Sequence, residues 1–244
     1  MISNLLVFGK IPISLLGAFG ALSFFSFSFV FWKRLRDDFE EERILSLTIF
    51  LALAFFIGSR FFYILTHFSS FGFSFSWFFW RSHPGFSFLG GILALIGTLY
   101  FWARKNEWDF WHLADQALIS FSVSISLFCL GIFIWQTDTF SFFWFLFSLF
   151  FLNIALFLSR NYRKFIWYES GKPGFVSSFC LFLFSLAILL LEIFSQNKVY
   201  CVGENFGFGL LFLGGLFFLY KRSERNLKQD WQKIKANFQR NRHG

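Results

Sequence analysis

Long apolar runs alternate with short charged segments along most of this chain. The runs lie at about residues 11–32, 44–66, 86–103, 112–136, 140–158, 174–195 and 205–220. Each is close to the roughly 20 residues that an α-helix needs to cross a hydrocarbon layer about 30 Å thick. The first run lacks the basic start and short apolar core of a cleaved signal peptide, so we expect a retained helix. The pattern predicts an all-α integral membrane protein with about seven transmembrane helices.

Composition supports this prediction and excludes a water-soluble domain. The chain has 244 residues, of which 56% are hydrophobic, 46 are Phe and only 15% are charged, whereas soluble domains carry about 25% charged residues. Its three cysteines, Cys129, Cys180 and Cys201, show neither a disulfide framework nor metal-ligand spacing. We therefore expect no metal and no other cofactor.

Basic residues gather in alternate loops, and this asymmetry predicts the orientation. The loops after the first, third and fifth runs, together with the C-terminal tail, hold most of the 22 Lys and Arg residues. Basic loops face the cytoplasm, which places the N-terminus outside and the C-terminus in the cytoplasm. We expect a transmembrane domain over residues 1–220 and a basic cytoplasmic tail over residues 221–244.

The tail spaces its apolar residues as one face of a helix does. Leu227, Trp231, Ile234 and Phe238 fall on that face, with basic residues around them. Such a helix suits the anionic surface of the inner leaflet, although a solvated tail that only sets the topology explains the pattern equally well. Because the formal charge of +8 is explained by the loops and tail, we expect no nucleic-acid partner.

Two ionisable side chains lie near the outer ends of apolar runs. Arg60, Tyr63 and His67 share one helical face, where a guanidinium could clamp a phosphate or extend to the lipid headgroups. Glu192, in the sixth run, has the most apolar surroundings of any carboxylate in the chain. Since both residues lie at similar depths, an ion pair between Arg60 and Glu192, structural or catalytic, is one hypothesis.

Asp115 opens the fourth run and shares a face with Ser122, Ser126 and Cys129. A carboxylate at the middle of a membrane helix costs about 2.5–3.5 kcal/mol, so it suggests a polar cavity on this face. Two simpler interpretations stay open. The serines could bond to their own helix backbone, and Asp115 could lie at the wet interface beside the positive end of the helix dipole.

Several short motifs occur in the same order as in a known family. The chain resembles the bacterial prolipoprotein diacylglyceryl transferases in these segments: Phe8-Gly9-Lys10-Ile11-Pro12-Ile13, Gly58-Ser59-Arg60 with Tyr63, Phe86-Ser87-Phe88-Leu89-Gly90-Gly91, Trp111-His112-Leu113-Ala114-Asp115, Leu130-Gly131-Ile132-Phe133-Ile134, and Lys172-Pro173-Gly174 before a run that reaches Glu192.

This resemblance implies an enzyme of the bacterial inner membrane with seven spans. The family moves diacylglycerol from phosphatidylglycerol onto the lipobox cysteine of a prolipoprotein, so its partners are a phospholipid and a signal peptide, and it uses no cofactor. By the resemblance, Glu192 and Arg60 are the catalytic candidates. Residues of the substrate-binding set would be Tyr63, Asp115, Gly90, Gly91 and Gly131.

Four polar positions of the family are apolar or cysteine in this chain. The family's histidine falls at Leu89, two of its arginines at Cys129 and Ile188, and an asparagine at Ile132. Whether the chain is an active enzyme therefore stays open. A divergent transferase is one hypothesis, and a catalytically impaired member that binds lipid or a membrane partner is the second. A small-solute transporter is the third, and the absence of a visible sequence repeat disfavours it.

Overall fold

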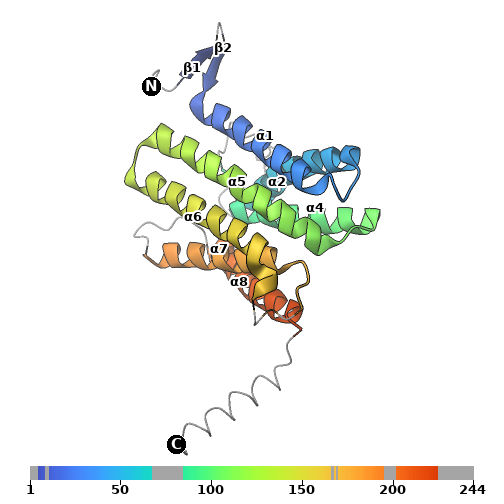
Figure 1. The fold of residues 1–244 in the computed structure, drawn as a ribbon. Helices are drawn as coiled ribbons and strands as arrows, with labels where there is room; N and C mark the ends of the chain where they lie inside the picture. The colour runs from blue at the N-terminus through green and yellow to red at the C-terminus, as the bar shows by residue number, and fades with distance from the viewer. Residues whose placement is uncertain are drawn as a thin grey trace, which may run out of the picture.

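The computed structural model describes residues 5–8, 11–67, 85–165, 168, 170–194 and 202–224, and seven long α-helices make up most of them (Figure 1). In chain order these are α1 (Leu15–Leu35), α2 (Glu41–Thr66), α4 (Phe88–Asn106), α5 (Phe110–Gln136), α6 (Thr139–Asn161), α7 (Phe175–Phe194) and α8 (Val202–Arg222), with the short 3-10 helix η2 (Tyr162–Lys164) after α6. Successive helices run in opposite directions, so the bundle has two ends.

The described helices confirm an all-α integral membrane protein. Six of them are long and apolar enough to cross a membrane, and α4 is the seventh long helix, outside that set because its last turn is basic at Arg104 and Lys105. The predicted runs match the helices to within a few residues. The predicted orientation stays a prediction, and most of the tail, residues 225–244, lies outside the described residues.

A β-hairpin precedes the bundle, which corrects the predicted start of the first helix. Strands β1 (Leu5–Phe8) and β2 (Ile11–Ser14) pair antiparallel, with Leu5 opposite Ser14. Helix α1 then begins at Leu15 rather than at residue 11. The Ser14 hydroxyl accepts a hydrogen bond from the Gly17 N–H at 3.1 Å, and this side-chain cap fixes the helix start.

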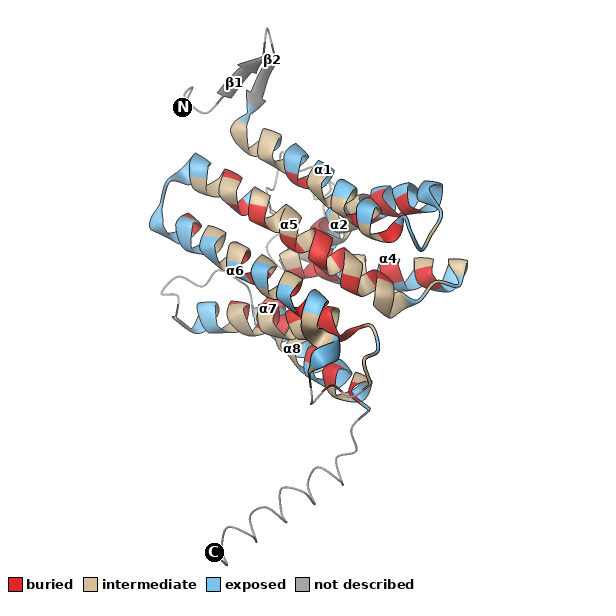
Figure 2. Ribbon diagram, viewed as in Figure 1, coloured by how far each residue is buried: buried red, intermediate tan, exposed pale blue. Residues whose placement is uncertain are grey.

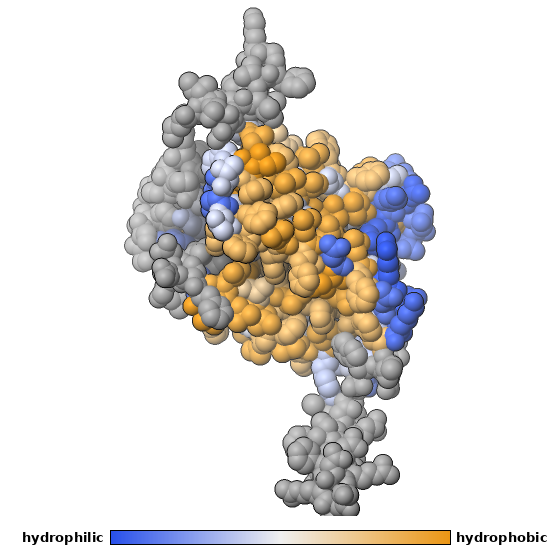
Figure 3. Space-filling model, turned by 60° about the vertical axis from the view of Figure 1, so that its left-hand side comes forward, coloured by the Kyte–Doolittle hydropathy of each residue, from blue (hydrophilic) through white to orange (hydrophobic). Residues whose placement is uncertain are grey.

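Apolar side chains cover the outer faces of the helices. Phe25, Phe101 and Ile193 are 67%, 67% and 74% exposed, and Figure 3 shows a broad hydrophobic surface between hydrophilic ends. Buried residues lie mainly where the helices face one another (Figure 2). Soluble proteins rarely expose so much contiguous apolar surface, whereas lipid chains would cover it.

The interior holds two hydrophobic clusters. The first, called the main cluster, runs through α4 to α8 and includes Leu89, Ile119, Val176, Ile188 and Phe208. The second lies between α1, α2, α4 and α5 and includes Phe31, Leu47, Leu99 and Leu113. It is at the end of the bundle that carries Arg104 and Lys105, called the basic end below. These clusters fix the relative positions of the helices that carry the polar groups described below.

Helices α2 and α4 approach each other closely at a pair of glycines. A Cβ added to Gly58 would lie 2.3 Å from the Cβ of Ala94 and 2.9 Å from the carbonyl oxygen of Gly90. A Cβ added to Gly90 would lie 2.2 Å from the Cβ of Phe62. Small residues allow such close approach between membrane helices. At Gly97, farther along α4, an added Cβ would meet nothing within 4 Å.

Candidate functional site

Arg60 lies near the end of α2 and its side chain is held in one position. The residue is 8% exposed, and Nη1 donates a hydrogen bond to the carbonyl oxygen of Gly85 at 2.8 Å. The guanidinium carbon lies 5.7 Å from the centre of the Tyr63 ring, a cation–π distance. The guanidinium therefore lies between the face of Tyr63 and the segment that leads into α4.

The start of α4 is attached to α2 beside this guanidinium. The Ser87 N–H donates to the Ser59 carbonyl at 3.0 Å, and the Ser87 hydroxyl accepts from the Gly90 N–H at 3.2 Å. A Cβ at Gly85 would lie 2.1 Å from the Tyr63 ring, so only glycine brings its carbonyl this close. The local sequence thus builds a rigid support for Arg60.

Tyr63 and His67 extend this cluster toward the helix end. Their rings stack with centres 4.3 Å apart, and His67 Nδ1 lies 3.1 Å from the Tyr63 carbonyl oxygen and 3.1 Å from the Thr66 hydroxyl. The prediction that Arg60, Tyr63 and His67 share one face is confirmed by these contacts. We refer to these three residues as the Arg60 cluster.

Glu192 lies at the same end of the bundle. The Asn205 side-chain amide approaches Glu192 Oε1 at 3.4 Å, and a Cβ at Gly203 would lie 3.7 Å from Thr66 Cγ2. The first turn of α8 therefore contacts Glu192 and lies close to the end of α2. Its Glu204 is only 6% exposed, and the sequence reasoning missed both Glu204 and Asn205. A direct ion pair between Arg60 and Glu192 stays a prediction.

The interior beside these groups is apolar. Leu89 and Ile188, both 0% exposed, belong to the main cluster, and a Cβ at Gly207 would lie 2.1 Å from Leu89 Cδ2. Cys129 borders a void of about 10 Å³ walled mainly by aromatic rings, which include Phe147 and Phe184. Such a void scarcely holds one water. Of the positions where the resemblance places charged or polar groups, Leu89 and Ile188 are therefore packed among apolar side chains, and Cys129 lies among aromatic rings beside Ser148.

Gly91 and Gly131 lie at helix–helix contacts. A Cβ at Gly91 would lie 2.6 Å from the Ser59 hydroxyl, and one at Gly131 would lie 2.4 Å from the Phe19 Cβ. These contacts join α4 to α2 and α5 to α1. Both glycines therefore serve helix packing in this structure. Substrate binding by Gly90, Gly91 and Gly131 stays a prediction.

Asp115 binds the start of another helix. Its side chain is buried, and Oδ2 and Oδ1 accept hydrogen bonds from the N–H groups of Gly174 and Ser177, each at 2.7 Å. Gly174 has a φ of +103°, and a Cβ there would lie 2.6 Å from the Trp111 ring, so the turn requires glycine. The carboxylate thus caps α7, where the helix dipole favours negative charge. Substrate binding by Asp115 stays a prediction.

The serines that share the face of Asp115 bond to backbone. Ser122 donates to the Ile119 carbonyl at 2.8 Å, and Ser126 donates to the Ser122 carbonyl at 2.8 Å. Ser126 also lies 3.0 Å from the Ser148 carbonyl of α6. The backbone interpretation of these serines is confirmed, and Ser126 additionally links two helices.

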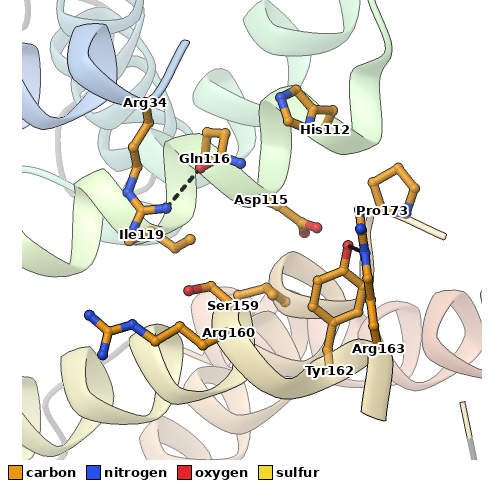
Figure 4. A pocket seen from close by; sticks show the side chains of 11 residues that line it. Arg34, His112, Asp115, Gln116, Ile119, Ser159, Arg160, Tyr162, Arg163 and Pro173 are labelled. Carbon is orange, nitrogen blue, oxygen red and sulfur yellow. Dashed lines mark hydrogen bonds between the residues drawn. The ribbon is translucent and has the colours of Figure 1, made fainter. Parts of the chain in front are cut away.

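A polar cavity of about 350 Å³ lies at the end of the bundle opposite the Arg60 cluster, where α1 and α6 end and α5 and α7 begin (Figure 4). Its lining is Arg34, His112, Asp115, Gln116, Ile119, Ser159, Arg160, Tyr162, Arg163, Pro173 and Val176. The sequence signalled these arginines only as charges that set the topology, because nothing local shows that four helix ends meet there.

A family model described as prolipoprotein diacylglyceryl transferase matches residues 3–140. The matched stretch includes Arg60, Tyr63, Gly90, Asp115 and Gly131, whereas Glu192 lies beyond it. No curated protein matches the chain.

Proposed function

Because this chain belongs to the prolipoprotein diacylglyceryl transferase family, we propose that it transfers diacylglycerol from phosphatidylglycerol to the lipobox cysteine of a prolipoprotein. The proposed location is the plasma membrane of a bacterium, with the Arg60 cluster at the outer leaflet. The observation that carries the proposal is the buried, fixed guanidinium of Arg60 beside Tyr63.

The reaction needs both a nucleophile and a stabilised leaving group. The cysteine sulfur attacks the carbon of the diacylglycerol unit that carries the phosphate. A carbon–sulfur bond forms there, and the bond between that carbon and the phosphate oxygen breaks. Glycerol phosphate leaves with the bonding electrons, and the thiol proton passes to a base. Since a free thiol has a pKa of about 8.5, the base is needed to generate the thiolate at neutral pH.

Arg60 is suited to bind the departing phosphate. A guanidinium carries five N–H donors in a fixed plane and binds phosphate oxygens in pairs. The bond to Gly85 and the contact with Tyr63 orient that plane before substrate arrives. A preorganised donor of this kind contributes roughly 10²–10³ in rate.

Glu192 is the proposed base. It lies at the same end of the bundle as Arg60, and the Asn205 amide lies beside its carboxylate. The first turn of α8, which carries Asn205, also lies close to Thr66 at the end of α2, beside the Arg60 cluster. With the N-terminus outside, this end faces the side of the membrane where a secreted prolipoprotein presents its cysteine.

The test uses the purified full chain in phosphatidylglycerol vesicles with a lipobox peptide, and mass spectrometry scores the diacylglyceryl adduct. We expect an adduct with the wild type, no adduct with Arg60→Ala, and a rate lowered about 10²-fold with Arg60→Lys. Arg104→Ala, an exposed arginine at the opposite end, is the matched control and should retain full activity. Absence of adduct beside an active family member would overturn the proposal.

A second candidate function follows from the apolar packing of Leu89, Cys129 and Ile188. In this alternative the chain has lost catalysis and binds lipid or a membrane partner. It predicts no adduct in the assay above, together with retention of phosphatidylglycerol by the wild type in native mass spectrometry. Weaker retention by Arg60→Ala than by Arg104→Ala would assign the binding to the Arg60 cluster.

A further inference from the structure

The polar cavity at the basic end gathers three arginines from separate parts of the chain. Arg34 lies in the last turn of α1, Arg160 in the last turn of α6, and Arg163 in η2. Figure 4 shows Arg34 hydrogen-bonded to Gln116 on one side of the cavity, Arg160 on the helix across it with its side chain extended along that helix, and Arg163 beside Tyr162. Three like charges around one cavity repel each other, so this arrangement requires compensation.

The protein supplies little of that compensation. Arg34 Nη1 donates to the neutral Gln116 side chain at 3.0 Å, and Arg163 Nε donates to the Tyr162 hydroxyl at 3.2 Å. Within the described part of the chain, no carboxylate forms an ion pair with Arg34, Arg160 or Arg163. Neutral partners orient these guanidiniums without neutralising them.

Among the described residues that line the cavity, Asp115 is the one carboxylate, and it is already engaged. Both of its oxygens accept backbone hydrogen bonds from the start of α7 at 2.7 Å. The carboxylate therefore interacts with the N-terminus of α7 and not with the arginines. His112 is turned to Asp38, with Nε2 3.1 Å from Oδ2. The cavity therefore keeps a net positive lining.

We propose that this cavity binds the phosphate group of an anionic ligand. Guanidiniums are the side chains best matched to phosphate oxygens, and a volume of about 350 Å³ far exceeds the roughly 10–15 Å³ that one water requires. Arg160 and Arg163 are exposed, so the ligand can enter from outside the bundle. The phosphate belongs either to a lipid headgroup of the adjacent leaflet or to a soluble phosphate compound.

This site is separate from the proposed transferase site. It lies at the opposite end of the bundle from the Arg60 cluster, and its three arginines take no part in the chemistry proposed for Arg60 and Glu192. A failure of phosphate binding here would leave the transferase proposal untouched, and the converse holds as well.

The experiment compares two charge-matched variants of the full chain. Arg34→Gln/Arg160→Gln removes two cavity cations, and Lys33→Gln/Lys105→Gln removes two exposed cations at the same end but outside the cavity lining. The probes are phosphatidic acid and phosphatidylcholine, scored by native mass spectrometry in neutral detergent, and inorganic phosphate, scored by titration calorimetry. Phosphatidic acid is used because it is not the proposed transferase substrate.

We expect the wild type and the lysine variant to bind a phosphate probe, and the arginine variant to bind it about a hundredfold more weakly. Arg163→Gln, at an exposed position, should weaken binding about tenfold without affecting folding. Retention of phosphatidic acid alone identifies a lipid headgroup, whereas binding of inorganic phosphate identifies a soluble ligand. Binding of neither probe, or equal loss in the lysine variant, would overturn the proposal.

Discussion

The carboxylate of Asp115 and the backbone N–H of Gly174 are joined by a 2.7 Å hydrogen bond that attaches α5 to the start of α7. A second bond of the same length reaches Ser177. The adjacent Pro173 carbonyl accepts two further bonds from Arg222, at 3.0 and 2.6 Å. Three helices are therefore tied together at the basic end through one short turn.

Asp115→Ala should lower the free energy of unfolding by about 1–3 kcal/mol, because two buried N–H groups lose their acceptor. Thermal unfolding in detergent, followed by circular dichroism, measures the effect. Asp109→Ala is the control, since Asp109 caps α5 in an exposed position through the Trp111 N–H at 3.0 Å. Equal losses in the two variants would contradict a special role for the buried cap.

Gly90→Ala should separate α2 from α4, because the new methyl group would meet the Phe62 Cβ at 2.2 Å and the Gly58 carbonyl at 2.6 Å. Overpacking of this kind costs about 1–3 kcal/mol, and we expect a lower unfolding temperature and a lower adduct yield, since Arg60 lies beside this contact. Gly97→Ala adds the same group where an added Cβ has no neighbour within 4 Å. If both variants behave alike, the close contact does not exist.

Ser126→Ala should destabilise the fold by less than about 1 kcal/mol, the usual size of a hydrogen bond between membrane helices. The loss comes from the 3.0 Å bond to the Ser148 carbonyl of α6. Ser28→Ala serves as the control, because Ser28 bonds only within its own helix, to the Phe24 carbonyl at 2.9 Å. A larger unfolding shift for Ser28→Ala would show that the link between α5 and α6 is not stabilising.

Tyr168 gives the fold a dependence on alkaline pH. Burial raises the pKa of its phenol above the ordinary value, and its hydroxyl donates to the Lys172 carbonyl at 2.9 Å. The folded state keeps this proton to a higher pH than the unfolded state does. The contribution of the phenol to the free energy of unfolding is therefore complete below a pH of about 10 and is lost as the pH rises further. We expect a fall in unfolding temperature above that pH that is smaller in Tyr168→Phe.

The control for this measurement is Tyr100→Phe. Tyr100 is 51% exposed on α4, so removal of its hydroxyl should leave the pH profile of the wild type unchanged. Identical profiles for Tyr168→Phe and the wild type would remove the buried phenol as the cause.

The positions of the helices could be predicted from the sequence wherever hydrophobicity alone determines where a helix begins and ends. The apolar runs predict α2, α5 and α6 to within a few residues, because a membrane helix must satisfy its backbone within one continuous segment. The same criterion fails at residues 11–14, where an equally apolar segment pairs with β1 instead. The helix start is set there by the Ser14 cap, which hydrophobicity does not register.

Side-chain partners were much harder to predict, since they depend on which helix ends meet. The sequence identifies Asp115 as unusual but does not show that Gly174 and Ser177 receive its two oxygens. It identifies Arg34 and Arg160 only as loop charges, and it gives no sign of their shared cavity. By contrast, the stack of Tyr63 on His67 follows from helical spacing, because both residues lie on one helix.

The main cluster also has an electrical consequence. It includes Ile119 and Val176, which line the cavity at one end, and Leu89, which lies at the start of α4 beside the other end. The two polar regions are thus separated by a layer of packed apolar side chains, a medium of low dielectric constant across which a bare charge is costly to move. Vesicles that contain this protein should hold a proton gradient, and most of the transmembrane voltage should fall across that layer, between Arg60 and Arg34.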